Sequence, residues 1–310
     1  MDIKALQPLP SFSWQREPLR AVDKDFFSYY GINFENDFPA GFDHRFGVMP
    51  LAAYQIVVHY FSLASNHKTI VLIHGYYDHV GLYGHLIKIL LQQGYNVLAY
   101  DLPGHGLSSG EQAGIPDFAD YQSVLKALLQ EALPHLPKPL YLIGQSTGGS
   151  IAMDYVLNNP QHEFEKMVLL APLVIPRQWY YLKFIIHTLG HFLSALPRHF
   201  VRNSHDDDFL HFLEFNEPLQ SRYVKRSWGK ALMRWQSHFL NSPLSALPVL
   251  LIQGNADTTV DWRYNLQQIR KKFTSMKVVM IAGGMHHLVN ESPDYREKIF
   301  SPLIRFLQAG

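Results

Sequence analysis

The stretch Leu140-Tyr-Leu-Ile-Gly-Gln-Ser-Thr-Gly-Gly149 decides the fold, and it holds Ser146 at the centre of a Gly-x-Ser-x-Gly motif. An apolar run precedes the motif, as in a buried strand, and Ile151, Tyr155 and Val156 follow it at helical spacing. A serine at a strand-to-helix turn needs small neighbours because its backbone is strained there. The helix N-terminus also favours negative charge beside the hydroxyl. This segment predicts a nucleophile at Ser146, and the alternative is a tight glycine-rich turn carrying an incidental serine.

The sequence around this motif alternates between strand-like and helix-like segments. Apolar runs typical of strands covered on both faces lie at 55–61, 69–73, 96–100, 140–143, 167–170, 249–252 and 277–281. Amphipathic helical spacing lies between them, at 82–90 and 121–129. Such alternation predicts an α/β domain with a mostly parallel central sheet, flanked by helices and connected by right-handed crossovers.

The alternation stops between residues 175 and 241, a length too great for an ordinary loop. This stretch is rich in aromatic residues and has helical spacing at Leu182, Ile185, Leu189, Phe192 and Leu196. We expect a helical cap inserted over one end of the sheet, with further helices of the main fold as the alternative. Residues 1–45 are predicted to form an N-terminal arm, and residues 1–310 a single domain.

A serine nucleophile needs a base, and a carboxylate to orient that base. In folds with this turn the order along the chain is serine, acid, histidine. Asp257 follows the strand at 249–252 and is the preferred acid, whereas Asp261 is better explained as a helix cap. His286 and His287 both follow the last strand, and the residues alone do not choose between them.

An oxyanion formed at Ser146 would need two hydrogen-bond donors. The strand at 69–73 ends in His74-Gly75-Tyr76, and a backbone N–H from such a loop pairs with that of the residue after the nucleophile. The predicted donors are therefore the amides of Tyr76 and Thr147. Their side chains are only indirectly constrained by this role.

Four motifs in the right order resemble the α/β-hydrolase fold. They are His74-Gly-Tyr-Tyr-Asp-His79 through Tyr83, Tyr100-Asp-Leu-Pro-Gly-His-Gly-Leu-Ser108, the Ser146 motif and the histidine loop at 283–291. Within that fold the chain resembles the monoacylglycerol lipase/lysophospholipase group of serine hydrolases. The resemblance runs from about residue 59 to the C-terminus and is weakest across 175–241.

The resemblance also implies which histidine is the base. The group's Gly-x-x-His-x-Leu-x-Asn-Glu loop fits 283–291 with His286 as the base. His287 stands where the group often has glutamate, and Gln145 and Thr147 stand where histidine and methionine are frequent. None of these departures removes a catalytic atom, but the last two put the substrate preference in doubt.

Metal or cofactor chemistry is not expected. His74, His79 and His85 lack the His-x-His-x-Asp-His spacing of binuclear metallohydrolases, and loop hydrogen bonds explain His74 better. Asp101 and His105 are likewise interpreted as turn residues. With no cysteine, the chain also lacks a disulfide framework, a thiolate zinc site and a thiol nucleophile.

The composition limits the partners. A formal net charge of +1 over 310 residues argues against a general nucleic-acid binder, and 47% hydrophobic residues indicate a globular chain. We see no signal peptide and no stretch that spans a bilayer, and we expect a cytoplasmic protein. The sequence does not give the oligomeric state.

The prediction is thus a cofactor-independent serine esterase that acts through an acyl-enzyme on Ser146. Small acyl esters of the monoacylglycerol or lysophospholipid type are the expected substrates, with transient contact between the cap and a membrane or lipid surface. The alternatives are a non-catalytic binding protein of the same fold, a metal-dependent hydrolase, and a hydrolase of peptide or C–C bonds.

Overall fold

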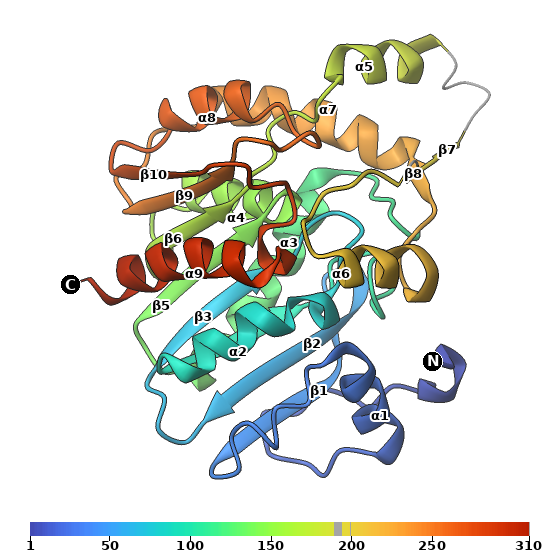
Figure 1. The fold of residues 1–310 in the computed structure, drawn as a ribbon, viewed down its shortest axis with the longest axis vertical. Coiled ribbons are helices and arrows are strands. Elements are labelled where there is room, and N and C mark those ends of the chain that lie inside the picture. The colour runs from blue at the N-terminus through green and yellow to red at the C-terminus, as the bar shows by residue number, and fades with distance from the viewer. Residues whose placement is uncertain (189–193, 199, 310) are drawn as a thin grey trace.

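The computed structural model describes residues 1–188, 194–198 and 200–309, and it is built around a twisted sheet of eight strands (Figure 1). The strand order is β1-β2-β4-β3-β5-β6-β9-β10. β1 and β2 pair antiparallel, β2 and β4 pair antiparallel, and all the other neighbours are parallel. The mostly parallel sheet predicted from the sequence is confirmed.

The sheet strands keep close to the predicted apolar runs. Their bounds are β1 Phe42–Leu51, β2 Tyr54–Leu63, β3 Lys68–Ile73, β4 Tyr95–Tyr100, β5 Leu140–Gln145, β6 Phe164–Leu170, β9 Val249–Gly254 and β10 Met276–Ile281. Strand β1 was not predicted, and it begins inside the stretch expected to be an arm. Its sequence mixes Arg45 and Gly47 with apolar residues because it is an antiparallel edge strand with one partner.

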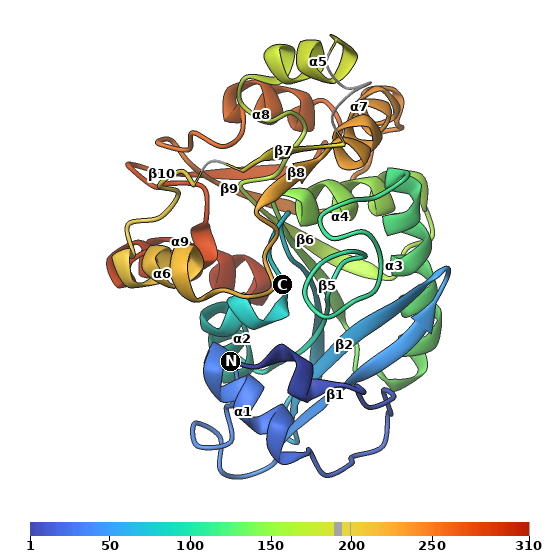
Figure 2. The ribbon, with the colours of Figure 1, turned by 90° about the vertical axis from the view of Figure 1, so that its right-hand side faces the viewer.

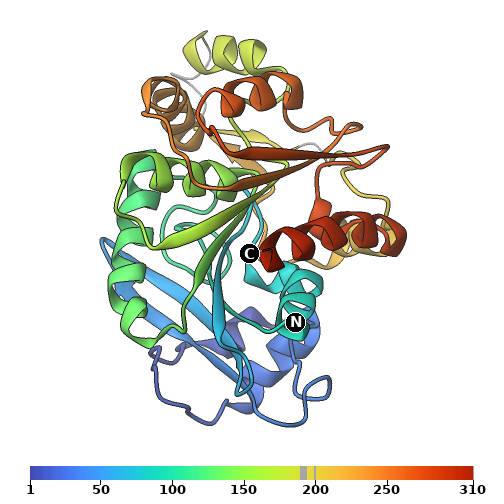
Figure 3. The same cartoon turned by 90° about the vertical axis from the view of Figure 1, so that its left-hand side faces the viewer.

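Helices cover both faces of the sheet. They are α1 Ala21–Tyr30, α2 Gly84–Gln92, α3 Phe118–Ala132, α4 Thr147–Asn158, α5 Trp179–Thr188, α6 Asp207–His211, α7 Arg226–Asn241, α8 Trp262–Arg270 and α9 Pro293–Gln308. Short 3-10 turns lie at Ile3–Leu6, Val80–Tyr83, Leu133–His135 and Leu288–Asn290, and one π turn lies at Phe212–Asn216. Figure 3 shows α3 and α4 on one side of the sheet, with α2 and α9 on the other.

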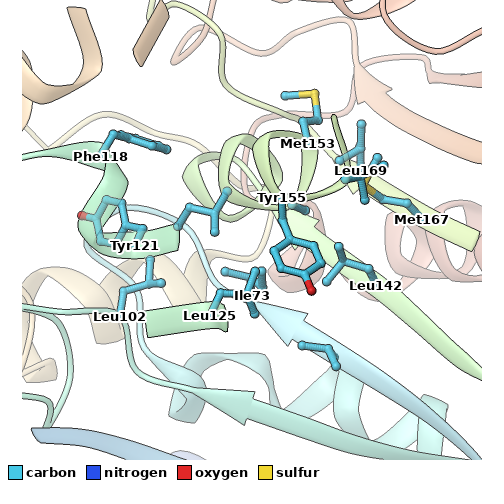
Figure 4. Packing of buried hydrophobic residues seen from close by; sticks show 14 of the residues in the cluster. Ile73, Leu102, Phe118, Tyr121, Leu125, Leu142, Met153, Tyr155, Met167 and Leu169 are labelled. Atoms are coloured by element: carbon cyan, nitrogen blue, oxygen red, sulfur yellow. The ribbon is translucent and has the colours of Figure 1, made fainter. Parts of the chain in front are cut away.

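Alternating side chains of the central strands divide the core into two layers. On β3, Val71 and Ile73 pack with the layer under α3 and α4, whereas Ile70 and Leu72 pack with the layer under α2 and α9. Figure 4 shows part of the first layer, where Tyr121 and Leu125 of α3 face Ile73. Burial on both faces is why these strands are nearly continuous apolar runs.

The segment 175–241 lies between β6 and β9 and contains α5, α6 and α7 (Figure 2). It also contains a two-stranded antiparallel sheet of β7 Ala195–Pro197 and β8 Tyr223–Lys225, which was not predicted. The predicted helical spacing is described as α5 up to Thr188, and Leu196, which was expected to continue it, lies in β7. Two other residues of that predicted spacing, Leu189 and Phe192, lie outside the described residues.

A buried ion pair ties this segment to the body of the domain. Glu217 Oε2 lies 3.2 Å from His79 Nε2, and Glu217 Oε1 accepts a hydrogen bond from Tyr30 Oη at 3.0 Å. Burial opposes the charge on His79, but the adjoining Glu217 carboxylate outweighs it and raises the pKa of His79. Across the described ranges, no helix is long and apolar enough to cross a membrane.

Candidate active site

The predicted site residues meet at the carboxyl end of the parallel strands. Tyr76 follows β3, Ser146 follows β5, Asp257 follows β9 and His286 follows β10. Loops that leave parallel strands at this end of a sheet converge on one crevice, where ligands commonly bind. The topology therefore brings together side chains that are up to 210 positions apart in the chain, from Tyr76 to His286.

Ser146 occupies the sharp turn between β5 and α4. Its φ of +51° and ψ of −114° lie in a region that non-glycine residues rarely adopt. A Cβ at Gly144 would lie 2.4 Å from the carbonyl oxygen of Gly148, and one at Gly148 would lie 2.1 Å from that of Ile73. Both glycines are therefore required by the close approach of α4 to the strands.

Ser146, His286 and Asp257 form a continuous hydrogen-bonded chain. His286 Nε2 lies 3.1 Å from Ser146 Oγ, and His286 Nδ1 lies 2.7 Å from Asp257 Oδ2. All three residues are buried. With Nδ1–H donating to the carboxylate, Nε2 faces the serine hydroxyl as an acceptor, which is the arrangement a general base needs.

The partners of Asp257 keep it ionised. Its Oδ1 accepts hydrogen bonds from the backbone amides of Thr259 and Val260, at 2.8 and 3.2 Å, and its Oδ2 accepts one from Gln253 Nε2 at 3.0 Å. Burial opposes its charge, but His286 and these donors outweigh it and lower the pKa of Asp257. Burial likewise opposes protonation of His286, and the adjacent Asp257 more than offsets it, so that the pKa of His286 is raised.

The competing residues lie elsewhere. Asp261 caps α8, where its Oδ1 accepts a hydrogen bond from the Tyr264 amide at 3.1 Å, as its alternative interpretation predicted. His287 turns away from the serine, and its Nε2 lies 3.1 Å from Asp78 Oδ1. Geometry therefore places His286 and Asp257, and not their neighbours, in line with Ser146.

The two residues predicted to supply oxyanion donors lie near Ser146. Thr147 is the first residue of α4, so its N–H has no partner within the helix. Tyr76 lies in the loop after β3, and its ring is stacked on Trp228 at a centroid distance of 4.0 Å. Both residues line the same cavity as Ser146 and His286.

A network that the sequence did not predict supports the loop of Tyr76. The Tyr83 hydroxyl accepts a hydrogen bond from the Gly75 amide and donates one to Asp78 Oδ2, both at 2.9 Å. His287 contacts the other carboxylate oxygen of Asp78. The Asp78 carboxyl is buried, which opposes ionisation, but His287 outweighs this and lowers the pKa of Asp78. Asp78 and Tyr83 belong to the motif at 74–83, so the sequence could have pointed to them. Nothing in the sequence linked them to His287.

The remaining histidine-rich motifs are structural, as expected. His74 Nε2 accepts a hydrogen bond from the Leu102 amide at 2.9 Å, and His74 Nδ1 lies 2.7 Å from the Gly75 carbonyl oxygen. Burial lowers the pKa of His74 to about 3, so this ring is neutral. Asp101 accepts hydrogen bonds from the amides of Val80 and Leu107, both at 2.9 Å. Among the described residues, no group of His, Asp or Glu side chains could hold a metal ion.

Ser146 lines a cavity of about 500 Å³ between the sheet end and the segment 175–241. Its wall is partly apolar, with Leu173, Pro176, Val201, Leu213, Val224, Trp228 and Val260. Several buried polar atoms of the same wall have no hydrogen-bond partner within the described chain, including the hydroxyls of Tyr77 and Thr147 and Gln145 Oε1. Unpaired buried polar groups are costly, so they indicate a place for a polar part of a ligand.

Comparisons with known proteins agree with this geometry. The family model described as "Serine aminopeptidase, S33" matches residues 64–293. The human protein named "Monoglyceride lipase" is 29% identical over 259 residues, which are 78% of this chain and 82% of the human protein. A monoacylglycerol lipase of Mycolicibacterium smegmatis is 34% identical over 106 residues, 34% of this chain and 38% of its own length.

Solved structures share the fold. A soluble variant of monoglyceride lipase from Saccharomyces cerevisiae, in complex with a substrate analog, superposes with a TM-score of 0.71 at 19% identity, covering 84% of this chain and 94% of its own. The monoacylglycerol lipase of Paleococcus ferrophilus gives a TM-score of 0.69 at 20% identity, covering 84% and 98%. At these identities the similarity shows only the fold, which is the α/β-hydrolase fold. Because the family model spans well over half of the chain, this protein belongs to the α/β-hydrolase family described as serine aminopeptidase, S33.

Proposed function

We propose that this hydrolase cleaves carboxylic esters with Ser146 as the nucleophile, His286 as the general base and Asp257 as the carboxylate that orients it. One observation carries the proposal: the chain of contacts at 3.1 and 2.7 Å, which starts at a strained serine between β5 and α4. The family match and the monoacylglycerol lipases among the relatives support the ester class.

The geometry supports a two-step acyl transfer. Ser146 Oγ attacks the ester carbonyl carbon while His286 Nε2 accepts its proton, and the imidazolium then gives that proton to the leaving alcohol. Water, deprotonated by His286, next attacks the acyl-serine. The bond between the acyl carbon and Ser146 Oγ then breaks, His286 returns the proton to Oγ, and the carboxylic acid leaves. The ionised Asp257 stabilises the imidazolium in both steps.

The amides of Tyr76 and Thr147 would stabilise the tetrahedral oxyanion. Because they are fixed by the β3 loop and the start of α4, they need little reorganisation when the negative charge develops. Loss of one such donor typically lowers the rate ~100- to 1000-fold. No residue in this scheme requires a cofactor.

The proposed substrates are monoacylglycerols or lysophospholipids. The apolar part of the cavity suits an acyl chain, and the unpaired polar atoms near Ser146 suit a polar alcohol head group. The human relative is named a monoglyceride lipase, and a Bacillus subtilis relative is named a phospholipase, with 31% identity over 103 residues. Both names support lipid esters as the substrate class.

The proposal includes transient contact with a lipid surface through α5. Tyr180, Tyr181 and Phe184 of this helix are exposed, with Lys183 beside them, and Figure 1 shows α5 at the periphery of the molecule. Aromatic and lysine side chains favour the interface between water and lipid. The cytoplasmic location stays a prediction.

Replacement of Ser146 by alanine tests the proposal. We expect Ser146→Ala to abolish hydrolysis of glycerol, choline and p-nitrophenyl esters, and labelling by a fluorophosphonate, while the far-UV circular dichroism stays unchanged. Labelling that persists in this variant would overturn the nucleophile. A chelator should leave the wild-type activity intact, and its loss would point to a metal-dependent hydrolase.

The description of the family also favours a second candidate, the hydrolysis of peptides from their amino end. An aminoacyl p-nitroanilide in the same panel tests it. Turnover of the anilide above that of the esters would favour the peptidase, whereas turnover of neither by a folded protein would favour a non-catalytic binding role.

A further inference from the structure

Arg198 of the segment 175–241 projects over the loop that carries the proposed oxyanion donor. Its Cζ lies 4.0 Å from the centroid of the Tyr77 ring and 4.7 Å from that of Phe200. Arg198 and Tyr77 line the same cavity as Ser146 and His286. A fixed positive charge thus lies in the cavity that holds the nucleophile.

The guanidinium is held in place before any ligand binds. Its Nη1 donates a hydrogen bond to Gln220 Oε1 at 2.7 Å, and the backbone amide of Arg198 donates to the Arg222 carbonyl oxygen at 2.8 Å. The aromatic rings of Tyr77 and Phe200 fix its plane by cation–π contact. A guanidinium immobilised in this way loses little conformational entropy when it binds an anion.

Arg198 makes no direct ion pair with a carboxylate of the described residues, although Asp78 is near enough to favour its charge. A second guanidinium, Arg222, lies 5.2 Å from the centroid of the same Phe200 ring. Asp78 is the carboxylate among the described lining residues, and its oxygens already contact Tyr83 and His287. Two arginines near one carboxylate that already has other partners leave an excess of positive charge, which an anion would relieve.

From this arrangement we infer that Arg198 forms an anion subsite that selects acyl esters with a phosphate on the alcohol head group, such as acylglycerol phosphates. The inference rests on the proposed esterase function and narrows its substrate class. A guanidinium presents parallel N–H donors that match phosphate oxygens, which makes it the preferred side chain for phosphate recognition. Arg222, whose guanidinium lies against the same Phe200 ring, adds to the positive potential.

The test compares two substrates that differ only in the phosphate. The kcat/KM of the wild type is measured on octanoylglycerol and on octanoylglycerol phosphate, below the concentrations at which they form micelles. We expect a preference for the phosphate ester of ~10- to 100-fold, the usual effect of a charge-assisted hydrogen bond. Arg198→Gln should abolish this preference, and Arg198→Lys should keep part of it because the charge remains.

Two controls separate this effect from general damage. Arg270→Gln removes an equal charge from the exposed end of α8, outside the cavity lining, and should keep the wild-type ratio between the substrates. Inorganic phosphate should inhibit octanoylglycerol hydrolysis competitively in the wild type and much more weakly in Arg198→Gln. Inhibition by phosphate without any preference for the phosphate ester would mean a free-anion site and would overturn the assignment to a head group.

A binding measurement keeps this inference separate from the esterase proposal. Calorimetry on Ser146→Ala should show tighter binding of octanoylglycerol phosphate than of octanoylglycerol, and Ser146→Ala/Arg198→Gln should bind the two equally. If neither ester is hydrolysed by the wild type but this difference holds, the esterase proposal fails and the anion subsite stands. If the two ligands bind Ser146→Ala equally, or if Arg198→Gln keeps the wild-type preference, the inference is wrong.

Discussion

Replacement of Asp257 by asparagine should reverse the proton arrangement of His286. Oδ1 of this carboxylate accepts the amides of Thr259 and Val260, so the asparagine carbonyl must take that position. Its NH2 group then replaces Oδ2 and faces His286 Nδ1 at the 2.7 Å contact. His286 Nδ1 would then have to accept a hydrogen bond, so the ring proton would move to Nε2. His286 would therefore present a donor to Ser146, where a base must present an acceptor.

The size of the expected loss in kcat depends on the cost of the alternative arrangement, in which the asparagine amide is turned over so that its carbonyl faces His286. Turning the asparagine amide over would leave the two backbone N–H groups unpaired, at ~1–3 kcal/mol each, and would regain one hydrogen bond, from Gln253, so that the net cost is about 1–3 kcal/mol. The variant also loses the negative charge that stabilises the imidazolium, and this loss adds to the barrier. We therefore expect kcat to fall by about 10³- to 10⁴-fold, in the range typical of such a substitution.

The assay is steady-state hydrolysis of p-nitrophenyl butyrate, with the rate of fluorophosphonate labelling as a second measure. Asp261→Asn is the matched control, because this carboxylate lies four residues on and caps α8. It should change kcat less than threefold and cost little stability, because asparagine caps a helix about as well as aspartate. An Asp257→Asn enzyme with more than a tenth of the wild-type kcat, or a larger loss in Asp261→Asn, would refute the reasoning.

Three further predictions follow from the same geometry. Gly148→Ala should lower the free energy of unfolding by about 1–3 kcal/mol in urea titrations and reduce kcat, because its Cβ would lie 2.1 Å from the Ile73 carbonyl oxygen; an unchanged midpoint would contradict this. His287→Leu should cost about 1–3 kcal/mol because it removes the ring that contacts the buried Asp78 carboxylate, and equal urea midpoints for variant and wild type would contradict this. Because the pKa of His286 is raised above 6.5 and only its neutral form accepts a proton, kcat/KM should fall as the pH drops through a value above 6.5, whereas a flat profile from pH 5 to 8 would count against His286 as the base.

Sequence reasoning predicted the sheet strands best where they are buried on both faces. β3, β5 and β9 are short apolar runs because helices cover them on each side, and this signal is local in the chain. β1 is an edge strand with polar residues, and β7 and β8 are three-residue strands that pair with each other. None of the three has a clear pattern of apolar residues. Leu196 fits the helical spacing but lies in β7, which shows that apolar spacing alone does not assign a residue to a helix.

The residues of the site likewise divide into those that a local sequence pattern marks and those that it does not. The Gly-x-Ser-x-Gly turn marked Ser146 because both glycines are short-range neighbours of the serine, although the backbone contact that requires Gly148 comes from Ile73 on β3. Gln253, which donates to Asp257, and His287, which contacts Asp78, carry no local signature because their roles depend on partners brought by other strands.

The sequence by itself determined the parallel α/β architecture, the strained serine turn and the order of serine, acid and histidine along the chain. These properties depend on periodicity, glycine positions and residue types that can be read within a few turns. Only the tertiary structure decided that the Asp257 and His286 side chains are aligned on Ser146, and that Arg198 reaches the cavity. Side-chain direction and the pairing of charges are set by contacts between segments far apart in the sequence, and it is these contacts that fix the chemistry of the site.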